Sequence, residues 1–537
     1  MLTDANGNAD RNDHAQTGSA LDATMAAALA ISPVAVAADS VRTLLGLYDG
    51  APPAPPAPPA PPIPRRIAMI STHASPLAAP GNIGYGGQSV YVSHLARELA
   101  RAGVAVDIFT CSDAPGQQPI VDWIDGVRII HVPPGPAHHV PKEELLTHAG
   151  AGARFVDSFL TRFVARFIAR FARRQQAMYD LVHAHHFVSG MVAARLKRSL
   201  KLPFVITFHT LGQVPRRAPG AGDGVATQRI RIETTLMHEA GRVIAACPQD
   251  RVDMEHLYQT PSPRIAVVPC GFSPAEFWPV PMGEARQRLR IASGCFVVLH
   301  LGRLGPRKGI DTVIQGVAML RQRHGIDAEM IVVGGDEYQP AGALSSRSND
   351  RPAPGLQVHG SRDNIHASLA LTQPAAISHE SAELARLRQL ALALGIGEHV
   401  RFEGCQPREI LRDYYAAANV FASTPWYAPS GITPVEAMAC ARAVVGAEVG
   451  GIKNTVRDGV TGYLVPARDP EALADRLARL QRHPEQAQRM GQLGRVRACE
   501  HYTWQRVAQQ LMTVYTEVLK ETRAVQRSAI QFGQESA

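Results

Sequence analysis

Two successive series of short apolar segments, each alternating with helical stretches, restrict the folds open to this chain more than any other feature. The first series lies at residues 67–71, 105–110, 181–184, 204–207, 243–246 and 265–268. The second lies at residues 296–301, 330–333, 400–402, 420–422, 443–446 and 462–465. Strands that alternate with helices form parallel sheets through right-handed crossovers. The pattern predicts an α/β protein with two doubly wound, Rossmann-like domains that face each other across a cleft.

Changes in composition divide the chain around these two series. An Ala-Pro-Pro repeat at 51–64 favours polyproline II and precedes the first strand, and the final helical stretch keeps an apolar stripe at Val507, Leu511, Val514 and Leu519. The predicted boundaries are 1–64 for a disordered tail, 65–283 for the first domain, 284–503 for the second domain with a surface insertion at 339–380, and 504–537 for a crossing helix and tail.

Composition excludes several classes of protein. The formal charge of +8 favours anionic ligands, but no helix-turn-helix, RNP-like or zinc-finger pattern accompanies it, so nucleic acid is not expected as a partner. The seven cysteines are scattered without a C-x-x-C pair, which argues against a disulfide framework or a zinc site and indicates a reducing cytoplasm. The longest apolar run, 25–38, contains Ser32 and Pro33 and is too short to span a bilayer.

Glycines and cations follow the first strand of the second series, in the sequence GRLGPRKG at 302–309. The glycines allow the backbone to approach a ligand closely, while Arg303 and Lys308 place positive charges at the carboxyl end of a strand. A phosphate site is predicted here, and the alternative is an ordinary entry into the helix at 311–323. In the first series, Gly86 and Gly87 open the helix at 89–102, where backbone N–H groups can bind an anion. This turn is predicted to form the opposite wall of the phosphate site.

A second helix start follows the strand at 420–422. The turn through Gly431, Ile432 and Thr433 leads into a helix at 434–440, so the N–H groups of these residues are expected to point out of a helix N-terminus, where the dipole favours phosphate. Glu436 lies one turn into the helix and could accept two hydrogen bonds from ribose hydroxyls. The alternative is a glutamate that only completes a helix N-terminus.

Together these motifs resemble a known family. The stretch STPWYAPSGITPVEAMACARAVVGAEVGG at 423–451 resembles the donor-nucleotide signature of retaining glycosyltransferases with two facing Rossmann-like domains, the GT-B, family 4 type. The clamp at 302–309 resembles the Arg-x4-Lys-Gly motif of these enzymes, and GGQSVY at 86–91 is similar to the branch of sucrose and sucrose-phosphate synthases. The resemblance extends over residues 65–523.

The resemblance implies roles for individual residues. Arg303 and Lys308 would neutralise the leaving nucleoside diphosphate, and His209 would lie beside the donor sugar without acting as a base. The nucleotide diphosphate sugar would be a substrate rather than a cofactor, with a hydroxyl acceptor and no requirement for a metal. The turn at 334–337 would form a wall near the nucleotide base.

The chain departs from the family pattern at one important position. The family has two glutamates eight positions apart, and Ala428 stands where the first is expected, while Ala441 stands where a glycine usually ends the helix. Two interpretations therefore remain open. One is a transferase that moves a hexose to a sugar, glycolipid or polysaccharide precursor. The other is a catalytically impaired protein of the same fold, with a nucleotide-sugar-binding or regulatory role. A nucleotide-sugar epimerase is disfavoured by the clamp.

Two further patterns have competing interpretations. At 155–174, phenylalanine and arginine each recur every four residues and form adjacent stripes on a helix. Packing on the sheet with a solvated arginine face is favoured over peripheral docking at the inner membrane. Alternation on a strand places His183 and His185 on one face and His186 on the other, without a third ligand, so a metal site is not expected.

Overall fold

The computed structural model describes residues 64–77, 86–112, 116–132, 164–174, 179–214, 223–335 and 381–535. The tail with its Ala-Pro-Pro repeat, the segment 339–380, the phenylalanines at 155, 159 and 163, and the second half of the 334–337 turn lie outside these residues.

The first domain is built on an eight-stranded sheet in the order β3-β4-β2-β1-β5-β6-β7-β8. Its strands are β1 (Arg66–Ile70), β2 (Ala105–Cys111), β3 (Ile120–Ile124), β4 (Val127–Val132), β5 (Leu181–His185), β6 (Phe204–Thr207), β7 (Arg242–Ala245) and β8 (Ile265–Val267). The helices around it are α3 (Gly87–Arg101), α6 (Ala165–Arg174), α7 (His186–Leu200), α8 (Asp223–Glu239) and α9 (Pro248–Tyr258). All strand pairs are parallel except β3 with β4.

The hairpin of β3 and β4 is absent from the sequence prediction. Asp125 and Gly126 connect the two strands, and Gly126 has the positive φ of 76° that such a turn requires. An Asp-Gly pair between alternating apolar residues is a strong hairpin signal. The hairpin was overlooked because the surrounding segments alternate between strands and helices.

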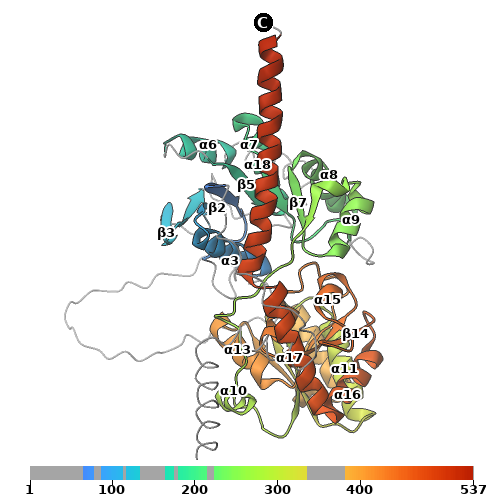
Figure 1. Ribbon diagram of the computed structural model, residues 1–537. Helices are drawn as coiled ribbons and strands as arrows, with labels where there is room; N and C mark the ends of the chain where they lie inside the picture. The colour runs from blue at the N-terminus through green and yellow to red at the C-terminus, as the bar shows by residue number, and fades with distance from the viewer. Residues whose placement is uncertain are drawn as a thin grey trace, which may run out of the picture.

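The second domain has a six-stranded parallel sheet in the order β11-β10-β9-β12-β13-β14. Its strands are β9 (Phe296–Leu301), β10 (Ala328–Val333), β11 (Val400–Gly404), β12 (Val420–Ser423), β13 (Ala443–Ala447) and β14 (Gly462–Val465). Its helices are α10 (Met282–Leu289), α11 (Ile310–Gln322), α12 (Ala382–Ala393), α13 (Arg408–Ala417), α14 (Ile432–Ala439), α15 (Gly450–Thr455), α16 (Pro470–Arg482) and α17 (Pro484–His501). The expected α/β class with two Rossmann-like domains is confirmed, and Figure 1 shows one domain above the other.

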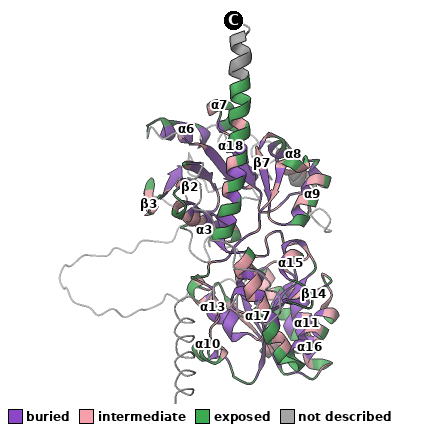
Figure 2. Cartoon of the chain, viewed as in Figure 1, coloured by how far each residue is buried: buried purple, intermediate pink, exposed green. Residues whose placement is uncertain are grey.

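The central strands of both sheets are buried on their two faces, as Figure 2 shows in purple. Helices cover both faces of a doubly wound sheet, so its strands consist of continuous runs of valine, isoleucine and leucine rather than alternating residues. This burial explains why the strand segments were recognisable as short apolar runs in the sequence.

The last helix, α18 (Trp504–Glu535), returns from the second domain to the first and runs along it (Figure 1). Its stripe of Val507, Leu511, Val514 and Leu519 is buried in the same apolar cluster as Ile67 of β1. The apolar stripe of the expected crossing helix is therefore buried against the first domain.

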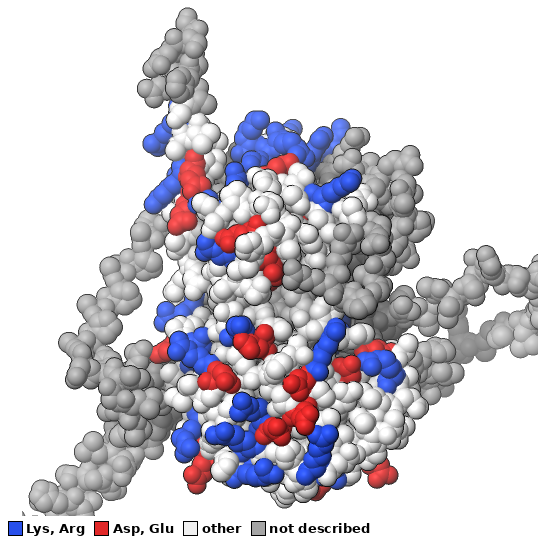
Figure 3. Space-filling view, turned by 90° about the vertical axis from the view of Figure 1, so that its right-hand side faces the viewer, with Lys and Arg blue, Asp and Glu red and all other residues white. Residues whose placement is uncertain are grey.

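The described part of the phenylalanine and arginine stripes lies on α6. Phe171 is buried and Phe167 is partly buried against the core of the first domain, whereas Arg166 and Arg170 are exposed. This arrangement agrees with the packing interpretation for these residues. Within the described ranges, no helix is long and apolar enough to cross a membrane. Lys and Arg are interspersed with Asp and Glu over the second domain on the face that Figure 3 shows.

Ala441 follows the end of α14 and has a φ of 55°, the left-handed conformation that a glycine after a helix end commonly adopts. We expect Ala441→Gly to raise the free energy of unfolding by about 1 kcal/mol, because glycine adopts this conformation without steric cost. The melting temperature should rise by about 2–4 °C. Ala524→Gly, at an exposed position inside α18, should lower stability instead. A loss of stability in Ala441→Gly, measured by chemical denaturation, would contradict the expectation.

Candidate active site

A group of cations lies at the carboxyl end of β9, the edge where doubly wound sheets bind ligands. Arg303 is exposed, and Arg307 and Lys308 are half-buried in the short 3-10 turn Pro306–Lys308 that precedes α11. Burial, with the charges of Arg307 and Arg303 adding to it, lowers the pKa of Lys308 to about 8. Three neighbouring positive charges form a site suited to a polyanion.

The loop that carries these cations is fixed to the loop that follows β12. Thr424 Oγ1 donates to the carbonyl of Gly309 over 2.8 Å, and Arg307 Nη1 donates to the carbonyl of Tyr427 over 2.8 Å. Gly309 has a φ of 66°, and a Cβ atom there would lie 1.9 Å from the carbonyl oxygen of Thr424. Only glycine fits at this position. The cations are therefore held on a rigid turn rather than on a mobile one.

The predicted glycines of the first domain lie directly opposite. A Cβ atom on Gly86 would lie 2.9 Å from Nη2 of Arg303, and one on Gly87 would lie 3.7 Å from Cδ1 of Ile432. The structure thus brings together three segments distant in sequence, at the start of α3, after β9 and at the start of α14. The N–H of Gly86 already donates to Ser89 Oγ over 2.9 Å, so this group has an acceptor within its own helix turn.

The turn at the start of α14 has the expected form. Gly431 is the N-cap residue with a φ of 56°, and α14 begins at Ile432, two residues before the predicted start. The turn is supported from α15, since the N–H of Gly451 donates to the carbonyl of Ala428 over 2.8 Å. The backbone around Ala428 is therefore fixed, and its short side chain packs at the edge of an apolar cluster. Thr433, the last residue of the predicted turn, is half-buried in the first turn of the helix.

Glu436 is more enclosed than the sequence suggested. Its side chain is only 2% exposed, and its carboxylate accepts hydrogen bonds from Arg408 Nη2 at 2.9 Å and from the hydroxyl of Tyr415 at 3.1 Å. Sequence reasoning did not find either partner. Each oxygen retains a second lone pair, so the carboxylate can still accept a further hydrogen bond.

His209 lies at the domain boundary, after β6, with a φ of 61°. Its Nε2 is 3.1 Å from Nδ1 of His185, and His183 in turn contacts Tyr515 of α18 and Thr207. Burial lowers the pKa of His183 to about 3 and also lowers that of His185. Both rings are neutral at physiological pH, so His185 acts here as a hydrogen-bonding group that holds the ring of His209.

A small cavity beside His209 is lined by both domains. Tyr91, Asp250 and Cys270 come from the first domain, while Tyr427 and Ser430 come from the loop after β12. Asp250 is buried, and burial raises the pKa of its carboxyl to about 7. The acid at this position was missed in the sequence because it also follows the capping pattern of a helix start: its Oδ2 accepts the N–H of Ala246 just before α9.

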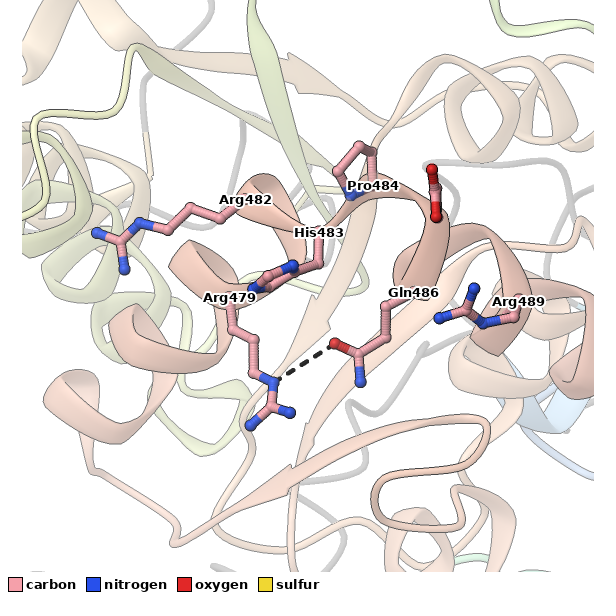
Figure 4. Close-up of a pocket in the computed structure, with 7 residues that line it drawn as sticks. Arg479, Arg482, His483, Pro484, Gln486 and Arg489 are labelled. Carbon is pink, nitrogen blue, oxygen red and sulfur yellow. Dashed lines mark hydrogen bonds between the residues drawn. The ribbon is translucent and has the colours of Figure 1, made fainter.

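A larger hollow lies elsewhere, on the surface between α16 and α17. Figure 4 shows Arg479, Arg482, His483 and Arg489 around it, with Arg479 donating to Gln486 over 3.4 Å. These side chains are exposed, and none of the predicted site residues lines the hollow. The interdomain boundary, and not this surface, is therefore the candidate active site.

Comparison with known proteins identifies the family. A family model described as glycosyl transferases group 1 matches residues 282–497, and a glycosyl transferase 4-like domain matches residues 86–271. The D-inositol 3-phosphate glycosyltransferase of Salinispora tropica is 33% identical over 471 residues, which cover 86% of this chain and 87% of the relative.

Solved structures agree with this assignment. The sucrose-phosphate synthase of Thermosynechococcus elongatus superposes with a TM-score of 0.69 at 29% identity, over 85% of this chain and all of that one. The Anabaena protein Alr3699/HepE, solved in complex with UDP-glucose, shares the fold with a TM-score of 0.59 at 18% identity, over 85% of this chain and 99% of that one. With relatives of this similarity along most of its length, and with the two family domains matching its two sheets in turn, the chain belongs to the GT-B glycosyltransferases and is an enzyme of that family.

Proposed function

We propose that this enzyme transfers a hexose from a nucleotide diphosphate sugar to a hydroxyl acceptor with retention of configuration at the anomeric carbon. The observation that carries the proposal is the group of cations at Arg303, Arg307 and Lys308, held on a rigid turn and facing Gly86 across the domain boundary. A diphosphate placed there would have its negative charge neutralised from one side and would lie near the N-termini of two helices.

In the proposed reaction, the bond between the anomeric carbon and the diphosphate oxygen breaks while a bond to the acceptor oxygen forms. Negative charge grows on the leaving diphosphate, where Arg303 and Lys308 stabilise it most strongly in the transition state. A diphosphate oxygen takes the acceptor proton, so no protein carboxylate is needed as a base. His209 would lie beside the sugar, held by His185, and would donate or accept a hydrogen bond there. In this scheme the charge neutralisation comes from the protein and requires no metal.

The donor is proposed to be a uridine diphosphate hexose. Support for a nucleotide sugar comes from the Anabaena protein, which was solved with UDP-glucose. The relatives named for D-inositol 3-phosphate and sucrose phosphate suggest that phosphorylated polyols and sugars should be tried first as acceptors. We propose the cytoplasm, where such donors are made, as the site of action.

A panel of nucleotide sugars tests the proposal. The purified protein is incubated with each donor, with and without D-inositol 3-phosphate or sugar phosphates, and release of nucleoside diphosphate is measured. Acceptor-dependent release with one donor and an α-linked product from an α-linked donor supports the proposal. Binding of nucleoside diphosphate without release from any donor and acceptor would instead favour a catalytically impaired sugar-binding protein.

The lowered pKa of Lys308 makes the affinity for diphosphate dependent on pH. Because a bound diphosphate raises the pKa of this ammonium group above about 8, full affinity is present below pH 8 and is lost as the pH rises above it. We expect the Kd for UDP to increase by up to about tenfold per pH unit between pH 8.5 and 9.5. Calorimetry of the wild type and of Lys308→Met measures this, and the same pH dependence in both proteins would contradict the role of Lys308.

A further inference from the structure

Four ionisable side chains form a continuous chain of contacts across the domain boundary, which we call the interdomain ion chain. Nε2 of His94, on α3 of the first domain, lies 3.4 Å from Oε1 of Glu276. Oε2 of the same carboxylate accepts from Arg408 Nε at 2.5 Å, and Arg408 Nη2 reaches Glu436 Oε1 at 2.9 Å. The interdomain ion chain therefore runs from the first domain, through the segment that connects the domains, to α13 and α14 of the second.

Aromatic rings hold the members of this chain in place. The ring of His94 stacks on Trp504, with centroids 5.4 Å apart and planes within 3° of each other. The guanidinium of Arg408 lies 4.9 Å from the ring centroid of Phe277, the residue after Glu276. The side chains of His94 and Arg408 are 10% and 17% exposed. The charge pairs of Arg408 with Glu276 and Glu436 are partly shielded from water and interact more strongly than surface pairs, which are screened.

Glu276 is the central link. Burial alone would raise its pKa, but the hydrogen bond from His94 and the charge of Arg408 outweigh burial and lower the pKa to about 2. The carboxylate is thus ionised throughout the physiological range. The connecting segment is itself fixed nearby, since Phe272 pairs with Thr503 and the N–H of Trp504 donates to the carbonyl of Phe272 over 3.1 Å.

We propose that Arg408 is a positioning residue for Glu436, and that Glu276 couples it to His94, so that donor binding and the closed placement of the two domains stabilise each other. This inference rests on the proposed function for the role of Glu436 toward the nucleotide. The geometry supports the coupling because α3 starts at Gly86 opposite Arg303 and α14 starts at the turn facing Gly87. The interdomain ion chain joins the same two helices a second time, farther along each, so rotation of one domain against the other must break at least one link.

A double-mutant cycle tests the coupling. Glu276 contacts both His94 and Arg408, one through each carboxylate oxygen. We expect His94→Gln and Arg408→Gln each to raise the Kd for UDP. If the two residues are coupled, the rise in the double variant should be smaller than the product of the two single rises, by a factor of about five or more. In a Glu276→Gln background, which keeps the shape and removes the charge, the effects should multiply. Multiplicative effects in both backgrounds would overturn the proposal.

Arg412 provides a matched control. It lies one turn after Arg408 on α13, and its guanidinium stacks 3.9 Å from the ring centroid of Trp278, but its carboxylate partner is Asp413 of its own helix. Arg412→Gln should leave UDP affinity and its coupling to His94 unchanged. Arg408→Lys, which keeps one positive charge, should restore part of the affinity lost in Arg408→Gln. Equal effects of Arg408→Gln and Arg412→Gln would mean that α13 is only structural.

A measurement without ligand separates this inference from the proposed function. Small-angle X-ray scattering of the full chain should show a larger radius of gyration for Glu276→Gln than for the wild type and for Arg412→Gln, at equal melting temperatures. If the wild type fails to bind UDP or any other nucleoside diphosphate, the proposed function fails. The scattering result alone then decides whether the interdomain ion chain holds the two domains closed. An unchanged radius of gyration in Glu276→Gln would overturn the closure role.

Discussion

Replacing Arg303 or Lys308 by alanine is expected to weaken UDP binding by about 100-fold. Each side chain offers charge-assisted hydrogen bonds to a diphosphate, and such bonds contribute about 1.5–3 kcal/mol each. Lys308 is half-buried beside two other cations. Titration calorimetry with UDP, and with uridine as a ligand that lacks the diphosphate, measures the effect. Uridine affinity should not change.

Arg323, which ends α11 in an exposed ion pair with Glu471, supplies the control. Arg323→Ala removes a cation from the same part of the second domain but from outside the interdomain boundary. We expect no change in UDP affinity for this variant, since exposed ion pairs contribute little and lie far from the site. Unchanged UDP affinity in both Arg303→Ala and Lys308→Ala would remove the clamp from the site, and with it the observation on which the proposed function depends.

Ala428→Glu is expected to raise turnover with a common nucleotide hexose about ten- to a hundredfold. The family places a glutamate here that contacts hydroxyls of the donor sugar, and a hydrogen bond to a charged group contributes about 1.5–3 kcal/mol to the transition state if it forms there. The carbonyl of Ala428 is already fixed by the N–H of Gly451, so the substitution changes a side chain on a preformed backbone. Steady-state kinetics with saturating acceptor measures the gain, while UDP affinity should stay the same.

Ala428→Gln separates charge from size at this position. A gain in Ala428→Glu that Ala428→Gln does not share supports the missing carboxylate as the cause of slow transfer. If the native enzyme already turns over at rates typical of hexosyltransferases and Ala428→Glu abolishes transfer, the pocket is specialised for another sugar, and the interpretation as a weakened enzyme is wrong.

The strands of both sheets could be predicted from the sequence because burial on two faces leaves a strong local signal. The placement of Arg303 and Lys308 at the carboxyl end of β9 was also predictable, because these residues follow a buried apolar strand in the sequence. The hydrogen-bonding partners of Glu436 could not be predicted from the sequence. Arg408 resembles an ordinary surface residue and Tyr415 an ordinary core residue in sequence, and only the folding of the second domain brings these two side chains of α13 to this carboxylate.

The same limit applies to His209. Its position after a strand was visible in the sequence, but its hydrogen-bonding partner is His185, on the neighbouring strand β5. Strand order is a property of the whole sheet rather than of either segment. The contacts of His209 therefore depend on which strands are neighbours in the sheet, and local sequence patterns do not contain this information.

The return of α18 to the first domain has a consequence for synthesis of the protein. A ribosome completes all strands of the first sheet long before it reaches Val507 and Leu511, which cover Ile67 and its neighbours. Until then, one apolar face of the nascent first domain is open to solvent and to other chains. Exposed apolar surface of this kind binds chaperones and favours aggregation. The apolar face beneath α18 is therefore covered only after the stripe from Val507 to Leu519 has been synthesised.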